Sequence, residues 1–159
     1  MIRFLQPYLF FIILLFSASQ AHADVTVQQL LDRDEAPAGV VFEIIADDDG
    51  LDWAVPAINS DVQRLRDRWP DLDIAVVSHG REQFALMASE SVAYPEVHEG
   101  VKQLVEDANV PVHVCGTHAG WYGVNPEDFP EYVDVSPAGP AQINDYRSLG
   151  YELVVLDER

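Results

Sequence analysis

Short apolar runs alternate along the chain with segments whose apolar positions recur every three or four residues. Five such runs, rich in Val and Ile, predict buried strands at 40–45, 74–78, 110–114, 132–135 and 153–156. Four segments with helical periodicity predict helices over 52–69, 81–88, 95–108 and 140–149. Continuous apolar strands that alternate with helices are typical of a parallel sheet covered on both faces. The pattern therefore predicts an α/β domain of three layers, α/β/α, around a five-stranded parallel sheet.

Proline, glycine and acidic residues mark the ends of these helices. The first helix is expected to take Asp52 as its N-cap and to end before Pro70. Pro95 and Pro140 stand where a proline suits the first turn of a helix, and Gly150 is a suitable stop for the last one.

The first 23 residues have a different character from the rest of the chain. Arg3 precedes an apolar stretch over 9–16, and the sequence Ala-His-Ala at 21–23 forms a small-x-small site. These are the three parts of a secretory signal peptide, and the stretch is shorter than the ~20 apolar residues that span a bilayer. The alternative is an uncleaved N-terminal anchor. We expect 1–23 to be a signal peptide, 24–39 a lead-in and 40–159 the α/β domain of an exported protein, periplasmic if bacterial and free of the membrane after cleavage.

Charge and cysteine content exclude several classes of protein. The 159 residues include 27 Asp and Glu against 9 Lys and Arg, a formal charge of −18, and one cysteine. An acidic chain lacks the basic surface that nucleic acids require, so no nucleic-acid partner is expected. One cysteine excludes an internal disulfide and a multi-cysteine zinc or iron–sulfur site. Asp47, Asp48 and Asp49 lack the alternation of a calcium loop, and we interpret them as a solvated turn whose charge repels anions.

The residues with the most reactive side chains follow the predicted strands. In open parallel sheets the functional crevice lies beyond the carboxyl ends of the strands. The second strand ends in His79-Gly80, and the third runs through His-Val-Cys-Gly-Thr-His at 113–118. Cys115 and His113 share a strand face, because side chains alternate with a period of two. The thiolate is the nucleophilic form of cysteine, and neighbouring imidazoles favour it.

Three interpretations of this cluster remain open. In the first, Cys115 is a nucleophile tuned by three histidines, His79, His113 and His118, with no cofactor. Its candidate substrate-binding residues are Gly80, Gly116, Thr117 and Trp121. In the second, the chain is a non-catalytic metal-binding or scaffold protein in which His113, Cys115 and His118 bind zinc or copper, with His79 as a fourth ligand. In the third, Cys115 is simply a small buried side chain.

The order of these features resembles the DsrE/DsrF-like family of sulfur-handling proteins over residues 40–157. The resemblance rests on the first strand with its acidic exit, on His79-Gly80, on Cys115-Gly116-Thr117, and on closing segments at 128–129, 133–139 and 148–151. It implies a flavodoxin-like fold, a homo-oligomer, and a role for Cys115 as acceptor of sulfane sulfur in the form of a persulfide. It also implies a protein partner as sulfur donor or acceptor. The resulting hypothesis is an exported sulfur carrier or sulfurtransferase-like protein.

Overall fold

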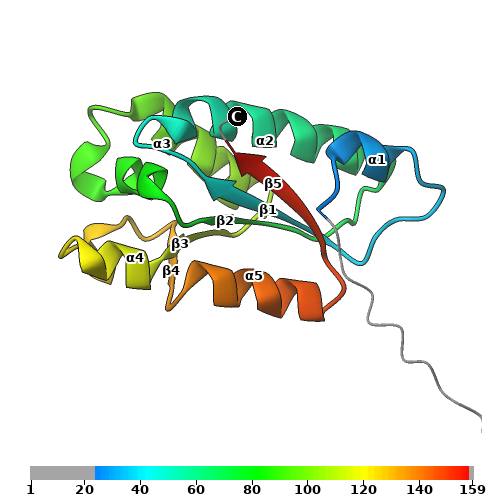
Figure 1. The fold of residues 1–159 in the computed structure, drawn as a ribbon. Helices are drawn as coiled ribbons and strands as arrows, with labels where there is room; N and C mark the ends of the chain where they lie inside the picture. The colour runs from blue at the N-terminus through cyan, green and yellow to red at the C-terminus, as the bar shows by residue number, and fades with distance from the viewer. Residues whose placement is uncertain (1–23, 158–159) are drawn as a thin grey trace, which may run out of the picture.

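The computed structural model describes residues 24–157 and builds them around a five-stranded sheet (Figure 1). The strands are β1 (Val40–Ile45), β2 (Ile74–Ser78), β3 (Val112–Cys115), β4 (Asp134–Ser136) and β5 (Glu152–Asp157). All neighbouring strands pair in parallel, in the order β4-β3-β2-β1-β5. The expected signal peptide over 1–23 lies outside the described residues. Within 24–157, no helix is both long enough and apolar enough to cross a bilayer.

Helices cover both faces of the sheet, which confirms the predicted three-layer α/β/α fold. One face carries α1 (Val27–Leu31), α2 (Gly50–Arg68) and α3 (Pro95–Lys102), which continues as the π-helical turn η3 (Gln103–Asp107). The other face carries α4 (Gly116–Trp121) and α5 (Gly139–Ser148) (Figure 1). The short 3₁₀ segments are η1 (Arg81–Leu86), η2 (Ala88–Glu90) and η4 (Pro126–Asp128).

Helix α2 begins earlier than its sequence pattern predicts. Its N-cap is Asp49, so the prediction that Asp52 caps the helix was wrong. The acidic turn after β1 leads directly into the helix, and Gly50 allows this close approach. A Cβ on Gly50 would stand 2.3 Å from the Cβ of Ala46. Pro56 therefore lies well inside the helix, on its exposed side.

The other differences from the predicted elements are small. Strand β3 begins at Val112 rather than at residue 110, and the carbonyl of the preceding Pro111 accepts a hydrogen bond from the N–H of Val76. Strand β4 begins two residues later than predicted, because Val133 closes a turn onto the carbonyl of Pro130. The segment predicted as a helix over 81–88 forms the 3₁₀ helix η1 and the start of η2 rather than an α-helix.

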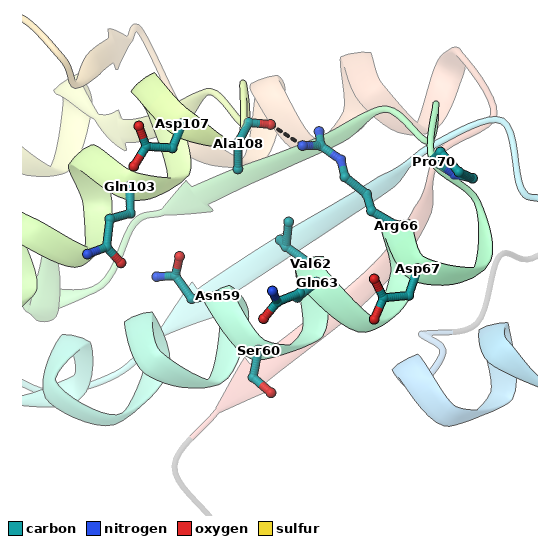
Figure 2. A pocket seen from close by; sticks show the side chains of 10 residues that line it. All are labelled: Asn59, Ser60, Val62, Gln63, Arg66, Asp67, Pro70, Gln103, Asp107 and Ala108. Atoms are coloured by element: carbon teal, nitrogen blue, oxygen red, sulfur yellow. Dashed lines mark hydrogen bonds between the residues drawn. The ribbon is translucent and has the colours of Figure 1, made fainter.

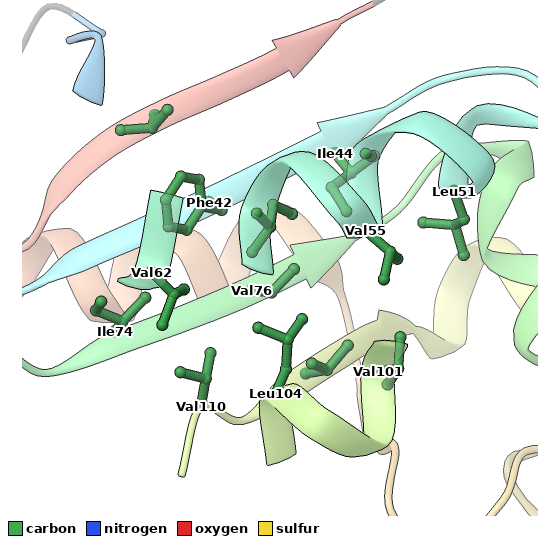
Figure 3. Packing of buried hydrophobic residues seen from close by; sticks show 14 of the residues in the cluster. Phe42, Ile44, Leu51, Val55, Val62, Ile74, Val76, Val101, Leu104 and Val110 are labelled. Carbon is green, nitrogen blue, oxygen red and sulfur yellow. The ribbon is translucent and has the colours of Figure 1, made fainter. Parts of the chain in front are cut away.

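Apolar side chains of the central strands are buried on both faces of the sheet. On the α2 and α3 face, Phe42 and Ile44 pack with Val76 and Leu104 in the larger cluster (Figure 3). On the α5 face, a smaller cluster joins Val41, Ala75, Val77, Ile143 and Leu153. The segment 24–39 takes part in this packing, since Leu30 of α1 is fully buried in the larger cluster. Burial on both faces explains why the strands read as continuous apolar runs.

Candidate functional site

A pocket of about 500 Å³ opens at the carboxyl edge of the sheet, beyond the ends of β1, β2 and β3. Six of the residues predicted for the site line it: His79, Gly80, Cys115, Thr117, His118 and Trp121. Five more complete its wall: Ile45, Ala46, Arg81, Ala138 and Pro140. Gly116 and His113 are not among the lining residues. The pocket therefore lies at the edge where the topology of a parallel sheet places a functional crevice.

Cys115 is held in position through its backbone and through its sulfur. It is the last residue of β3, its thiol is free, and the residue is only 4% exposed although it lines the pocket. Its N–H donates to the side-chain oxygen of Gln83 at 2.8 Å. Its sulfur accepts a hydrogen bond from the N–H of His118 at 3.4 Å, and this bond caps the N-terminus of α4. The thiol is thus largely shielded from bulk solvent although it borders a pocket.

The His118 ring lies among aromatic side chains beside this thiol. Its Nδ1 donates to the carbonyl of His79 at 2.8 Å, which leaves Nε2 as the acceptor nitrogen of the neutral ring. Phe84, Trp121 and Tyr122 surround the ring, with centroids 5.4 to 5.7 Å from that of the imidazole. Trp121 itself is 77% exposed, so it stands at the mouth of the pocket.

His79 is paired with a carboxylate that the sequence analysis did not single out. Its Nε2 lies 2.7 Å from Oε1 of Glu43, and both side chains are about 15% exposed. Glu43 lies in β1, on the same sheet face as Val41, and β1 is the direct neighbour of β2. The available signal was an acidic residue inside the apolar run Val-Val-Phe-Glu-Ile-Ile.

A second acid, Glu82, holds the backbone of two residues that line the pocket, Gly80 and Ala46. It is fully buried, and its Oε1 accepts from the Ser78 hydroxyl at 2.7 Å and from the Gly80 N–H at 2.9 Å. Its Oε2 accepts the Ala46 N–H at 2.9 Å. The carboxylate therefore joins the exits of β1 and β2. Nothing in the local sequence distinguishes this acid from an exposed one.

Gly116 and Thr117, at the start of α4, contact the backbone at the end of β4. A Cβ on Gly116 would stand 3.0 Å from the carbonyl oxygen of Ser136, so the glycine allows the two strands to approach. The Thr117 hydroxyl donates to the carbonyl of Pro137 at 2.6 Å. Gly116 thus shapes the strand exit without lining the pocket.

His113 shares the strand face of Cys115, as predicted, but its contacts are with other groups. Its Nε2 lies 2.8 Å from the Tyr146 hydroxyl, and its Nδ1 lies 3.9 Å from a carboxylate oxygen of Asp134. Across residues 24–157, no three His, Cys, Asp or Glu side chains form a group that holds a metal ion. The structure therefore does not bring His113, Cys115 and His118 together as a ligand set, because the His113 ring lies against α5 and that of His118 against the His79 carbonyl.

Burial lowers the pKa of the His113 imidazole below its ordinary value of about 6.5, and the nearby carboxylate of Asp134 opposes this effect. The folded chain then binds this proton more weakly than the unfolded chain, so the stability due to neutral His113 is lost as the pH falls below about 6.5. The wild type is expected to have a higher free energy of unfolding than His113→Gln, and we expect this difference to decrease when the pH is lowered from 7.5 to 5. Urea unfolding at both pH values measures this difference. A difference that stays constant with pH would contradict it.

A larger hollow, of about 560 Å³, lies between α2 and η3 (Figure 2). Seven of its ten lining residues are polar or charged, and Arg66 reaches across it to donate to the carbonyl of Ala108. It contains neither the thiol nor an imidazole. The pocket at Cys115 is therefore the better candidate for chemistry.

These observations define an α/β protein with a five-stranded parallel sheet and a single buried thiol in a pocket at its carboxyl edge. No family model matches the chain, and no curated protein matches it. Solved structures do. MTH1491 of Methanobacterium thermoautotrophicum, described as a protein of unknown function, has a TM-score of 0.58 at 20% identity, over 74% of this chain and 99% of that one.

Two further solved structures have a similar fold. The YchN protein of Escherichia coli has a TM-score of 0.54 at 13% identity, over 74% of this chain and 99% of its own. BT1422 of Bacteroides thetaiotaomicron, described as a conserved protein of unknown function, has a TM-score of 0.52 at 11% identity, over 73% and 94% of the two chains. At these identities the likeness concerns the fold alone.

Proposed function

We propose that this chain is an exported sulfur carrier or sulfurtransferase-like protein of the DsrE/DsrF-like kind. Cys115 would accept sulfane sulfur as a persulfide and pass it on. The observation that carries the proposal is the placement of the only thiol: Cys115 is 4% exposed yet faces a pocket of about 500 Å³ that His79 and His118 also line. A merely packed cysteine has no need of such a space.

The surrounding groups suit a displacement at sulfur. The thiolate attacks the outer sulfur of a persulfide, a bond to Sγ forms, and the donor thiolate leaves, as in thiol–disulfide exchange. The His118 N–H holds the attacking sulfur in place at 3.4 Å. The Nε2 of neutral His118 is an acceptor for a proton, and His79, with its partner Glu43, forms a second polar wall.

The compartment and the partners belong to the same proposal. An exported chain, in the periplasm if the source is bacterial, would meet its sulfur donor and acceptor there. Its acidic charge of −18 favours hand-over from a protein partner with a basic surface. Assembly as a homo-oligomer is also proposed, on the resemblance to the family.

Intact-mass spectrometry after treatment with a persulfide donor tests the proposal. Wild-type protein is expected to gain the mass of about one sulfur atom, reversed by a reducing thiol, because a persulfide is reducible. Cys115→Ser should gain nothing, since the hydroxyl cannot form the S–S bond. His118→Gln should load more slowly than wild type while remaining folded. No gain on wild type, or a gain that persists in Cys115→Ser, would refute sulfur transfer at this residue.

A further inference from the structure

Building on the sulfur transfer proposed above, we infer that the pocket selects donors that carry their sulfane sulfur on an uncharged, apolar group. It discriminates against donors that bring a negative charge to Cys115. Two features of the pocket support this inference: its apolar wall, and the pairing of two of its basic side chains, Arg81 and His79, with carboxylates.

The wall around the thiol offers apolar surface from three elements. Ile45, at the end of β1, is 44% exposed, and Trp121, at the end of α4, is 77% exposed. Ala138 and Pro140 contribute the side nearest α5. An apolar group bound here would remove these surfaces from water, which is favourable in proportion to the area buried.

The arginine in the wall is already paired with a carboxylate. Arg81 makes a two-pronged ion pair with Asp48, with its Nε 2.9 Å from Oδ1 and its Nη2 2.8 Å from Oδ2. The hydrogen bond from Arg81 lowers the pKa of Asp48, so the pair stays charged well into the acidic range. An anionic donor would have to displace this carboxylate and would meet its repulsion.

Of the two imidazoles in the wall, one faces a carboxylate and the other donates to a backbone carbonyl. His79 faces Glu43 at 2.7 Å, and the charge of any imidazolium there is already matched by that carboxylate. The Nδ1 of His118 donates to the carbonyl of His79. A donor's negative charge brought into this pocket would therefore meet the carboxylates of Asp48 and Glu43, which already face Arg81 and His79.

The transfer step itself requires no charge on the group R that carries the sulfane sulfur. The Cys115 thiolate attacks the outer sulfur of R–S–S–H, the new S–S bond forms, and the old one breaks with its electron pair on R–S⁻. The proton stays on the transferred sulfur, and no electron is gained or lost overall. The neutral persulfide is the electrophile, which suits an apolar pocket.

The test uses two donors that differ in charge but share the same S–S bond: benzyl persulfide and its para-carboxylate. We expect wild-type Cys115 to gain sulfur about tenfold faster from benzyl persulfide, because the carboxylate of the other donor is repelled by Asp48 and Glu43, which already pair with Arg81 and His79. Each rate, measured by intact mass, is divided by that of a small free thiol with the same donor, which removes intrinsic reactivity.

Matched variants show whether the pocket causes the difference. Asp48→Asn releases Arg81 and should reduce the rate ratio to about threefold or less. The control, Asp71→Asn, removes one negative charge before β2, at the opposite edge of the sheet, and should leave the rate ratio unchanged. Equal normalised rates for the two donors, or equal ratios in both variants, would overturn the inference and leave sulfur transfer intact. No loading of Cys115 from either donor would refute both.

Discussion

Glu82→Ala is expected to lower the free energy of unfolding by about 4 kcal/mol, because it leaves three donors without their acceptor. The carboxylate accepts hydrogen bonds from Ser78, Gly80 and Ala46, at a residue with no exposed surface. Each buried donor left unpaired costs about 1–3 kcal/mol, and the lost side chain leaves a cavity as well. Urea unfolding of the variant and the wild type measures the loss.

Two further variants separate the hydrogen bonds from the general effect of removing an acid. Glu82→Gln keeps an acceptor oxygen for Ser78 and Gly80 but turns an N–H₂ toward Ala46, so we expect about half the loss. Glu35→Ala removes an exposed acid and should change stability by less than about 0.5 kcal/mol. A Glu82→Ala variant as stable as Glu35→Ala would show that the three bonds contribute little.

Gly139→Ala is expected to lower stability by about 2 kcal/mol and to slow sulfur loading of Cys115 by about tenfold or more. A Cβ on Gly139 would stand 2.6 Å from the Cβ of His79 and 3.4 Å from that of Cys115. These are rigid positions next to the backbone, so α5 or the strand exits must shift. Urea unfolding and the intact-mass assay report the two effects.

Gly120→Ala is the matched control, since it makes the same change in a helix near the pocket. Nothing lies within 4 Å of a Cβ at Gly120, and alanine suits a helix better than glycine by about 0.5–1 kcal/mol. We therefore expect it to be neutral or slightly stabilising. Similar stability and loading in the two variants would contradict a close fit between α5 and the thiol.

The positions of most candidate site residues at the strand ends followed from the sequence. The runs 40–45 and 74–78 correspond to β1 and β2, so His79 and Gly80 could be placed directly at a strand exit. Cys115 was likewise expected at the end of the third strand, where it lies. Local apolar periodicity determines these positions, and a parallel arrangement brings all the exits to one edge.

The chemical surroundings of the thiol did not follow from the sequence. His113 was expected to tune Cys115, and it contacts Tyr146 of α5 instead. Glu43 contacts His79, and its only signal was its place inside an apolar strand run; Gln83 contacts Cys115 and carried no signal that distinguished it from other polar residues. Both depend on which strand or turn lies beside which, a property that periodicity does not contain.

The sequence by itself determined the alternation of strands and helices, the three-layer class and the edge of the sheet at which Cys115 lies. Only the tertiary structure decided the strand order β4-β3-β2-β1-β5 and the contacts made across it. Glu43 and His79 are 36 residues apart, Gln83 and Cys115 are 32 apart, and His113 and Tyr146 are 33 apart. Local patterns arise from each residue's near neighbours along the chain, whereas these pairs exist only once the sheet has assembled.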